Sequence, residues 1–161
     1  MIYYMNSPVL DSNTNSIVIG TDTYASTTKN PSLLDIRRNF PRIYRRYKKA
    51  CQRNTVLLCN PQFNREGIEN ENKSIIFLPI RNDTYRSSSI QKLRAACNNL
   101  ADLCVKQNIT ELDIDLNSFL PFSGTIQTLV DNMIGALDDR IDNLYIHTKC
   151  DTIIFDRGIS I

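Results

Sequence analysis

The chain has 161 residues and a mass of 18.5 kDa, a length typical of one domain. A 42% share of hydrophobic residues is enough for a sizeable core, and no stretch approaches the run of about 20 apolar residues that a membrane-spanning helix needs. We therefore expect a single domain over residues 1–161, located in the cytoplasm, with no signal peptide and no membrane partner. The five cysteines form no Cys-x-x-Cys pair, which favours free thiols over disulfides or a metal site.

Charge is distributed unevenly along the chain, although the formal net charge is only +2. Residues 112–142 are acidic, whereas the basic side chains gather in one short segment. The basic residues of that segment are Arg37, Arg38, Arg42, Arg45, Arg46, Lys48, Lys49 and Arg53. Such an asymmetry allows contact with phosphate-bearing partners without making the whole protein a nucleic-acid binder.

Short apolar runs alternate with helical patterns and predict the strands of a sheet. The clear runs are residues 16–19, 74–78, 111–115 and 143–147, and the weaker ones are residues 2–5, 56–60 and 152–155. Strands that alternate with helices favour a largely parallel sheet covered by helices on both faces. The pattern therefore predicts an α/β fold.

Three helices are predicted from apolar spacings of three and four residues. The basic helix begins at Pro41, a residue suited to a first helical position, and its arginines and lysines point outward. The longest helix spans about residues 88–107, after serine N-cap candidates at residues 87–89. The last spans about residues 125–137, with Ser123 or Gly124 at its start.

Two segments, residues 20–31 and residues 116–124, lack any periodicity. Each follows a predicted strand and precedes a helix, which is where ligands bind in open α/β sheets. We therefore expect a ligand site between these two loops. Residues 60–73 are rich in polar side chains and predict an exposed loop.

Two motifs resemble a known family. Residues 17–23 read Ile-Val-Ile-Gly-Thr-Asp-Thr, and residues 40–51 read Phe-Pro-Arg-Ile-Tyr-Arg-Arg-Tyr-Lys-Lys-Ala-Cys. They are similar to the Gly-x-Asn-Thr loop and the Phe-Pro-x-x-Tyr-x-x-Tyr-Lys-x-x-Cys helix of macro domains, in the subgroup of DNA ADP-ribosyl glycohydrolase antitoxins and ADP-ribose-1″-phosphate phosphatases. Residues 78–81 and 87–93 also resemble the family's Phe-Pro-Thr-Lys strand end and Ser-x-x-x-Ile/Leu helix start. The resemblance implies a three-layer α/β/α macro-domain-like mixed sheet.

The resemblance also implies binding of ADP-ribose, of an ADP-ribosylated molecule or of a related nucleotide diphosphate, and no metal or cofactor. Hydrolysis of an ADP-ribose linkage or of ADP-ribose-1″-phosphate is left open. In such a reaction Asp22 or Asp115 would orient water, and Arg81, at the position of the glycohydrolase lysine, would hold an anionic group. Asp22 also fits an ordinary turn cap. The candidate ligand-binding residues are Gly20, Thr21, Thr23, Phe122, Ser123, Gly124 and Thr125.

The ligand loops depart from the family pattern. Ser7-Pro8-Val9 stands where the family has an adenine-contacting Gly-Asp/Asn-Ile/Leu, and proline offers no backbone N–H. The second loop has one glycine, Gly124, in place of a glycine-rich run. These departures favour an alternative, a macro-like pseudoenzyme that binds a protein or a polyanion through Arg37, Arg38, Arg42, Arg45, Arg46, Lys48 and Lys49. A divergent domain of this kind suits a virus or phage, in which case it would act in the host cytoplasm.

For several further side chains the sequence is consistent with either a functional or a structural role. Asp113 and Asp115 alternate on one strand face, where they form either paired carboxylates for acid–base chemistry or a solvated surface. Phe119 and Phe122 either stack on a base or, as we favour, fold back onto the core. His147 is the only histidine and is predicted to be a packed strand residue.

Overall fold

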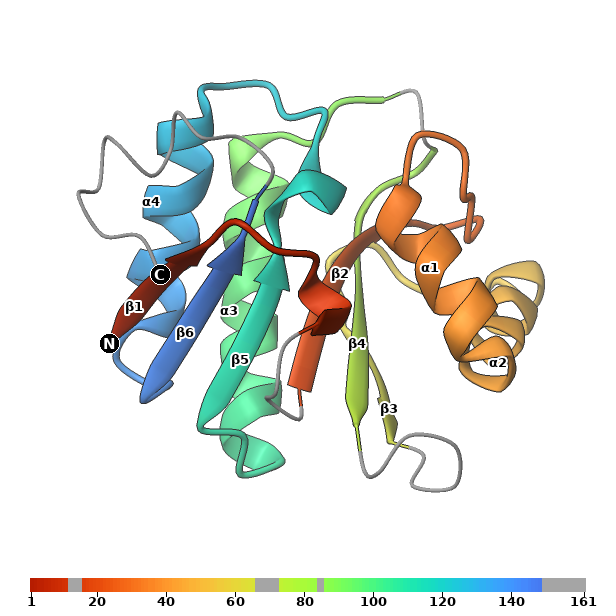
Figure 1. Ribbon diagram of the computed structural model, residues 1–161. Coiled ribbons are helices and arrows are strands. Elements are labelled where there is room, and N and C mark those ends of the chain that lie inside the picture. The colour runs from red at the N-terminus through yellow and green to blue at the C-terminus, as the bar shows by residue number, and fades with distance from the viewer. Residues whose placement is uncertain (12–15, 66–72, 84–85, 149–161) are drawn as a thin grey trace.

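The computed structural model describes residues 1–11, 16–65, 73–83 and 86–148. In this part of the chain six strands form one sheet, in the order β1-β6-β5-β2-β4-β3 (Figure 1). The strands are β1 (Ile2–Met5), β2 (Ser16–Asp22), β3 (Gln62–Arg65), β4 (Ser74–Arg81), β5 (Glu111–Asp115) and β6 (Asn143–His147). All neighbours pair in parallel except β3, which runs antiparallel to β4 at one edge. The sheet is therefore mixed, as the sequence predicted.

Four α-helices cover the sheet within the described residues, α3 and α4 on one face and α1 and α2 on the other (Figure 1). They are α1 (Pro31–Asn39), α2 (Pro41–Gln52), α3 (Ile90–Lys106) and α4 (Ile126–Leu137). Two short 3-10 helices, η1 (Val9–Asp11) and η2 (Leu116–Phe119), lie in the loops. This is a three-layer α/β/α arrangement.

The central strands are buried on both faces. In β2, Val18 packs into the core beneath α3 and α4, whereas Ile17 and Ile19 pack into the core beneath α1 and α2. Alternate side chains of a strand point to opposite faces, so both sides of such a strand must be apolar. This requirement explains why β2 and β4 read as nearly continuous apolar runs.

Capping residues place the first turns of the helices at the carboxyl edge of the sheet. Asn30 caps α1 by accepting a hydrogen bond from the Leu33 N–H at 3.2 Å, and its own amide donates to the Gly20 carbonyl at 2.9 Å. Ser89 and Thr125 cap α3 and α4 in the same manner. The start of α1 is thus joined directly to β2.

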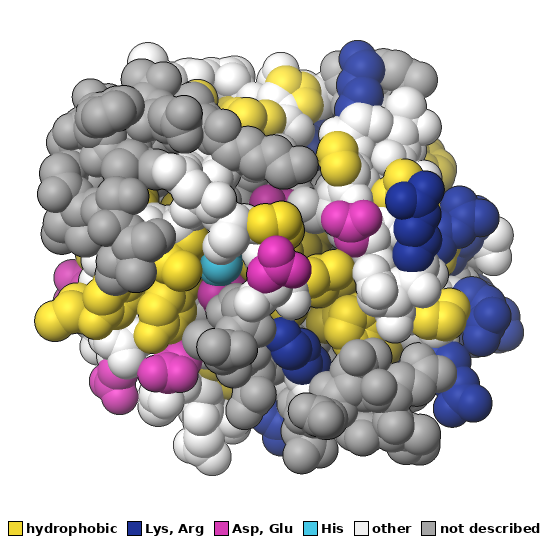
Figure 2. All heavy atoms as spheres, viewed as in Figure 1, with side chains coloured by type: hydrophobic (Ala, Val, Ile, Leu, Met, Phe, Trp, Pro, Cys, Tyr) yellow, Lys and Arg dark blue, Asp and Glu magenta, His cyan; other side chains and the backbone are white. Residues whose placement is uncertain are grey.

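Basic side chains lie over α1 and α2 and face solvent (Figure 2). Tyr44 and Tyr47 of α2 are buried against the sheet, where Tyr47 stacks on Phe77 with ring centroids 4.4 Å apart. The basic helix is therefore amphipathic as predicted, with its cations outward. No helix in the described ranges is both long and apolar enough to cross a membrane.

Most of the predicted strands and helices are confirmed, but two predictions are wrong. Residues 56–60 form no strand, and Cys59 within them has φ 69°, a value that breaks extended backbone. Residues 60–73 are not wholly a loop, because β3 occupies Gln62–Arg65; an edge strand has one exposed side and tolerates polar residues. The sequence also missed α1. The predicted strand at residues 152–155 lies outside the described residues, as does Cys150.

Candidate ligand-binding site

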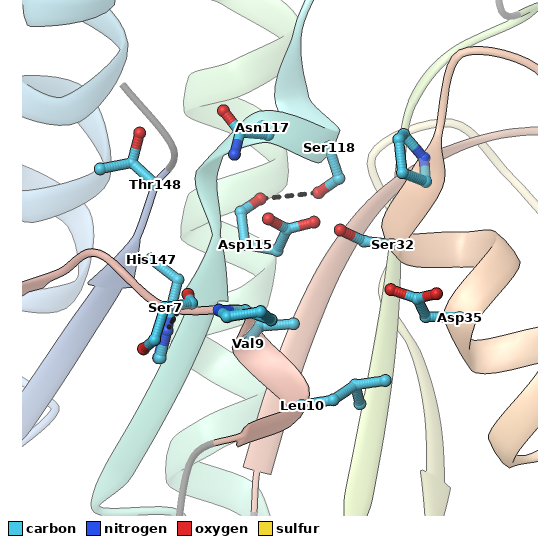
Figure 3. A pocket seen from close by; sticks show the side chains of 12 residues that line it. Ser7, Val9, Leu10, Ser32, Asp35, Asp115, Asn117, Ser118, His147 and Thr148 are labelled. Atoms are coloured by element: carbon cyan, nitrogen blue, oxygen red, sulfur yellow. Dashed lines mark hydrogen bonds between the residues drawn. The ribbon is translucent and has the colours of Figure 1, made fainter. Parts of the chain in front are cut away.

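A cavity of about 300 Å³ opens at the carboxyl ends of β5 and β6, between η1 and α1 (Figure 3). Residues 7–10 form one wall and the first turns of α1 form the opposite one. The remaining walls come from η2 and from the last residues of the two strands. The cavity therefore unites segments that are far apart in the sequence.

The carboxylates in the lining of the cavity make its charge negative. The lining includes the carboxylates of Asp35 and Asp115, and none of the described lining residues is a lysine or arginine. Ser32 points from α1 toward Asp115 (Figure 3), and its amide N–H lies in the first helical turn, where no carbonyl of the same helix can accept it. Carboxylate oxygens accept hydrogen bonds, so the interior suits a ligand that presents amino or hydroxyl groups.

A buried histidine–carboxylate pair stands behind the wall that residues 7–10 form. His147 lines the cavity, its Nε2 lies 2.5 Å from Asp113 Oδ1, and its Nδ1 lies 3.0 Å from the Ser7 carbonyl oxygen. Asp113 and His147 are both fully buried, and Asp115 is 4% exposed. The interpretation of the aspartates as a solvated strand face is therefore wrong, whereas His147 is a packed strand residue as predicted.

The predicted catalytic residues occupy two different places in the fold. Asp115 lines the cavity. Asp22 is 3% exposed, and its Oδ1 accepts hydrogen bonds from the N–H groups of Tyr24 and Ser26 at 2.9 and 3.0 Å, so it caps the turn of the first loop. Arg81 is 4% exposed and is the register partner of Asp22, so these two residues lie together at the ends of β2 and β4. The structure thus brings only one of the three to the cavity, and their catalytic roles stay predictions.

Arg81 joins the end of β4 to the second loop. Its Nη2 donates to the carbonyls of Ser118 and Leu120 at 2.8 and 3.1 Å. Burial lowers the pKa of the guanidinium, and the nearby Asp22 carboxylate opposes that effect. The side chain therefore acts as a clamp on the backbone of η2.

The ligand-binding candidates of the first loop also have internal partners. The Gly20 N–H donates to Ser118 Oγ at 2.7 Å. The hydroxyls of Thr21 and Tyr47 share a hydrogen bond at 2.7 Å, and Thr23 Oγ1 donates to the Asn82 carbonyl at 3.0 Å. None of the three candidates is part of the described cavity lining.

The candidates of the second loop lie beside the start of α3. Both the N–H and the hydroxyl of Ser123 donate to the Ser88 carbonyl at 2.9 Å. Phe122 packs partly buried against the core, as we expected, and lies so close to Gly124 that a Cβ there would be 2.7 Å from its ring. Thr125 caps α4. These residues are likewise outside the described lining, and their ligand-binding role stays a prediction.

Sequence reasoning named Ser7-Pro8-Val9 only as a departure from the family's adenine-contacting motif, and it missed Leu10 and the first turns of α1. A signal for α1 was present, because Asn30-Pro31 pairs a strong N-cap residue with a proline at the first helical position. Recognising it would have placed Ser32 and Asp35 at the carboxyl edge of the sheet. The sequence around η1 has no periodic spacing of apolar residues that would have predicted this short helix.

A second feature is a shallow depression on α2, of about 310 Å³, lined by Arg42, Arg45, Arg46 and Lys49. Arg42 and Lys49 each lie three and four residues from Arg45 and Arg46, which places these cations on one stripe of the helix. Among the described residues no group of three or more His, Cys, Asp or Glu side chains could hold a metal ion.

No protein-family model and no curated protein matches this chain. Solved structures match it in fold. The macrodomain of Mycobacterium tuberculosis DarG has a TM-score of 0.81 at 19% identity, covering 91% of this chain and 97% of that one. The macrodomain of Thermus aquaticus DarG has a TM-score of 0.80 at 16% identity, covering 92% and 98%. Thermosipho africanus DarTG in complex with ADP-ribose has a TM-score of 0.70 at 12% identity, covering 88% of this chain and 40% of that longer one.

Proposed function

We propose that this chain, which has the macrodomain fold, binds ADP-ribose or a related nucleotide diphosphate, with the nucleoside in the cavity beside η1. The observation that supports this most is the cavity of about 300 Å³ at the carboxyl ends of β5 and β6. Crevices at that edge are where open α/β sheets bind ligands, and the volume lies at the lower end of the range for small-molecule sites. A structural neighbour, Thermosipho africanus DarTG, is in complex with ADP-ribose.

The charges of the lining indicate how such a ligand would lie. The carboxylates of Asp35 and Asp115 would accept hydrogen bonds from the amino and hydroxyl groups of a nucleoside, and they would repel a phosphate placed beside them. The first turn of α1, where the amide N–H of Ser32 has no acceptor within the helix, offers the positive end of a helix dipole. We therefore place the nucleoside inside the cavity and the diphosphate at its mouth, against α1.

The test is calorimetric titration with ADP-ribose and with adenosine. Ser32→Glu adds a negative charge at the second helical position, where it favours the helix but opposes a phosphate. Ser32→Gln is the matched neutral variant. We expect micromolar binding of ADP-ribose by the wild type, at least tenfold weaker binding by Ser32→Glu than by Ser32→Gln, and equal adenosine binding by the two variants. No binding of ADP-ribose at millimolar concentration would overturn the proposal.

A narrower proposal is hydrolysis of an ADP-ribose linkage or of ADP-ribose-1″-phosphate, with Asp115 as the group that orients the water. Of the three catalytic candidates Asp115 lines the cavity, whereas Asp22 and Arg81 bind loop backbone. Asp115→Asn keeps the volume of the side chain and removes its negative charge. We expect this variant to retain ADP-ribose within a few-fold of the wild-type affinity and to lose hydrolysis; unchanged turnover would exclude this role.

A second candidate function is binding of a polyanion by a catalytically inactive domain. The cationic depression on α2 favours it, because four basic side chains line one stripe of the helix. Affinity for a labelled oligonucleotide should then fall steeply with salt and fall again in the double variant Arg45→Glu with Lys49→Glu. If that variant binds the oligonucleotide as the wild type does, α2 is not the binding surface.

A further inference from the structure

We propose that the buried Asp113–His147 pair is the positioning device of the cavity: through the Ser7 carbonyl it fixes the wall that residues 7–10 present to the ligand. The inference rests on the proposed ligand binding and deepens it. His147 is the only histidine of the chain, and neither it nor Asp113 has a part in the functions proposed above.

The imidazole of His147 connects the end of β6 to β5 and to the segment that follows β1. It sits at the end of β6, contacts Asp113 of β5 through Nε2, and contacts Ser7, which follows β1, through Nδ1. The β5–β6 register pairs His147 with Asp115, so the ring reaches diagonally back to Asp113. A rigid ring with polar atoms on both edges is suited to such a bridge.

The partners fix where the protons lie. A backbone carbonyl only accepts hydrogen bonds, so Nδ1 of His147 must be protonated and must donate to Ser7. Nε2 then either donates to an ionised Asp113 or accepts from a protonated one, and in both cases the pair is neutral overall. Neutrality is what full burial requires, since an unpaired buried charge is costly.

The described hydrogen bond of the Asp113 side chain goes to the imidazole of His147. The Oδ1 of Asp113 contacts His147, its Oδ2 has no hydrogen-bond partner among the described residues, and Asp113 is not part of the described cavity lining. A carboxylate that is buried with one of its two oxygens unsatisfied is unfavourable by itself. The hydrogen bond to His147 is therefore the described contact through which Asp113 acts on the wall.

The wall is attached to the sheet at Ser7. The last backbone link between β1 and β6 is the bond from the Thr148 N–H to the Met5 carbonyl at 3.0 Å, after which the chain turns into η1. The other described hydrogen bond of this wall, from the Asp11 N–H to the Pro8 carbonyl at 3.0 Å, stays within the segment. The bond from His147 to Ser7 therefore connects the wall to the sheet, and Val9 adds its buried side chain.

The experiment uses the one histidine as a reporter. In the ¹⁵N spectrum of the wild type, the imidazole should show a protonated, slowly exchanging Nδ1. Asp113→Asn keeps both bonds, because the amide donates to Nε2 and Nδ1 still donates to Ser7. Asp113→Leu has a similar volume and leaves Nε2 without a partner. His147→Phe removes both bonds.

We expect Asp113→Asn to bind ADP-ribose within about threefold of the wild type and Asp113→Leu to bind it at least tenfold more weakly. The backbone amides of Ser7, Val9 and Leu10 should exchange faster in Asp113→Leu and in His147→Phe, without ligand, while those of β4 stay protected. Wild-type affinity and exchange in Asp113→Leu, or an equal loss in Asp113→Asn, would overturn the inference.

Two further outcomes keep the test decisive. If Asp113→Leu does not fold, an unprotonated Nδ1 in the wild-type spectrum still overturns the inference, and a protonated one with loosened wall amides in His147→Phe supports it. If the wild type binds no ADP-ribose, the proposed function fails, but the exchange of the wall amides in the same variants still decides whether the pair positions the wall.

Discussion

Ser118 lies so close to Gly20 that a Cβ at residue 20 would be 2.8 Å from the Ser118 carbonyl oxygen. The Gly20 N–H also donates to Ser118 Oγ, and that hydroxyl in turn donates to the Asp115 carbonyl at 2.7 Å. β2 and η2 are therefore in direct backbone contact. Since Ser118 and Asp115 both line the cavity, this contact holds one of its walls in place.

Substituting Gly20 with alanine should destabilise the protein. The added Cβ would meet a backbone atom that cannot rotate away, and overpacking of this kind costs roughly 1–3 kcal/mol. Gly135→Ala is the matched control, because a Cβ there meets nothing within 4 Å and a helical glycine-to-alanine change stabilises by roughly 0.5–1 kcal/mol. Urea denaturation of both variants measures the difference, and equal stabilities would contradict the close packing of β2 against η2.

Removing the guanidinium of Arg81 should loosen the second loop. Arg81→Met leaves the buried carbonyl of Ser118 and the partly buried carbonyl of Leu120 without this donor, at a cost of roughly 2–4 kcal/mol in the free energy of unfolding. Arg86→Met serves as control: it breaks an ion pair with Asp83 whose arginine side chain is 70% exposed, and its effect should stay within about 0.5 kcal/mol. If the two variants unfold alike, Arg81 is not a clamp and a role in the reaction becomes more attractive.

The spacing of apolar residues along the sequence was sufficient to predict most strands and helices of this fold. β2, β4, β5 and β6 were found from their apolar runs, and the macrodomain fold inferred from residues 17–23 and 40–51 is confirmed by the structural neighbours. β3 was missed because an edge strand with a polar exposed side carries little of this signal. Helix α1 was missed because its basic last turn hides a short apolar stripe.

The site could not be predicted to the same extent, because its walls depend on contacts between distant residues. The bond between His147 and Ser7 spans 140 positions and exists only because β1 pairs with β6. Asp22 and Arg81 matched a family pattern by position, but their side chains bind neighbouring backbone in this chain. Asp115 was found because polar residues at the carboxyl end of a parallel strand lie at the ligand edge.

Stability should fall in alkaline solution because three cysteines are buried as thiols. Burial raises the pKa of Cys51 to about 11 and those of Cys97 and Cys104 to about 12, from an ordinary value of 9.0. These groups ionise first in the unfolded chain. Their contribution is therefore complete below pH 9, and it is lost up to about pH 11 for Cys51 and about pH 12 for Cys97 and Cys104, by at most about 1.4 kcal/mol per pH unit for each thiol.

Urea denaturation at pH 7.5, 9 and 10 measures this slope. The double variant Cys97→Ala with Cys104→Ala is the control, since it removes two of the titrating groups while lowering stability at every pH through lost packing. We expect its stability to fall less steeply between pH 9 and 10 than that of the wild type. Identical slopes would show that the buried thiols do not cause the alkaline loss.

Neutralising Asp35 should raise the affinity of the cavity for a charged nucleotide. Asp35 lines the cavity one turn into α1, so its charge opposes a diphosphate bound against that helix. Between two charges that lie several ångströms apart at a protein surface, such a repulsion weakens binding by roughly 0.5–1.5 kcal/mol. Salt screens this effect. Asp35→Asn should therefore bind ADP-ribose several-fold more tightly than the wild type at low salt, with a smaller gain at high salt.

Adenosine provides the discriminating ligand for this prediction. It carries no phosphate, so Asp35→Asn should leave its affinity unchanged or reduce it through loss of a strong acceptor. Asp139→Asn is the matched variant, because it makes the same change in net charge on an exposed residue beyond the far end of α4. Calorimetry with both ligands at two salt concentrations separates the effects. An equal gain in Asp139→Asn would assign the effect to net charge, and weaker ADP-ribose binding in Asp35→Asn would place the diphosphate away from α1.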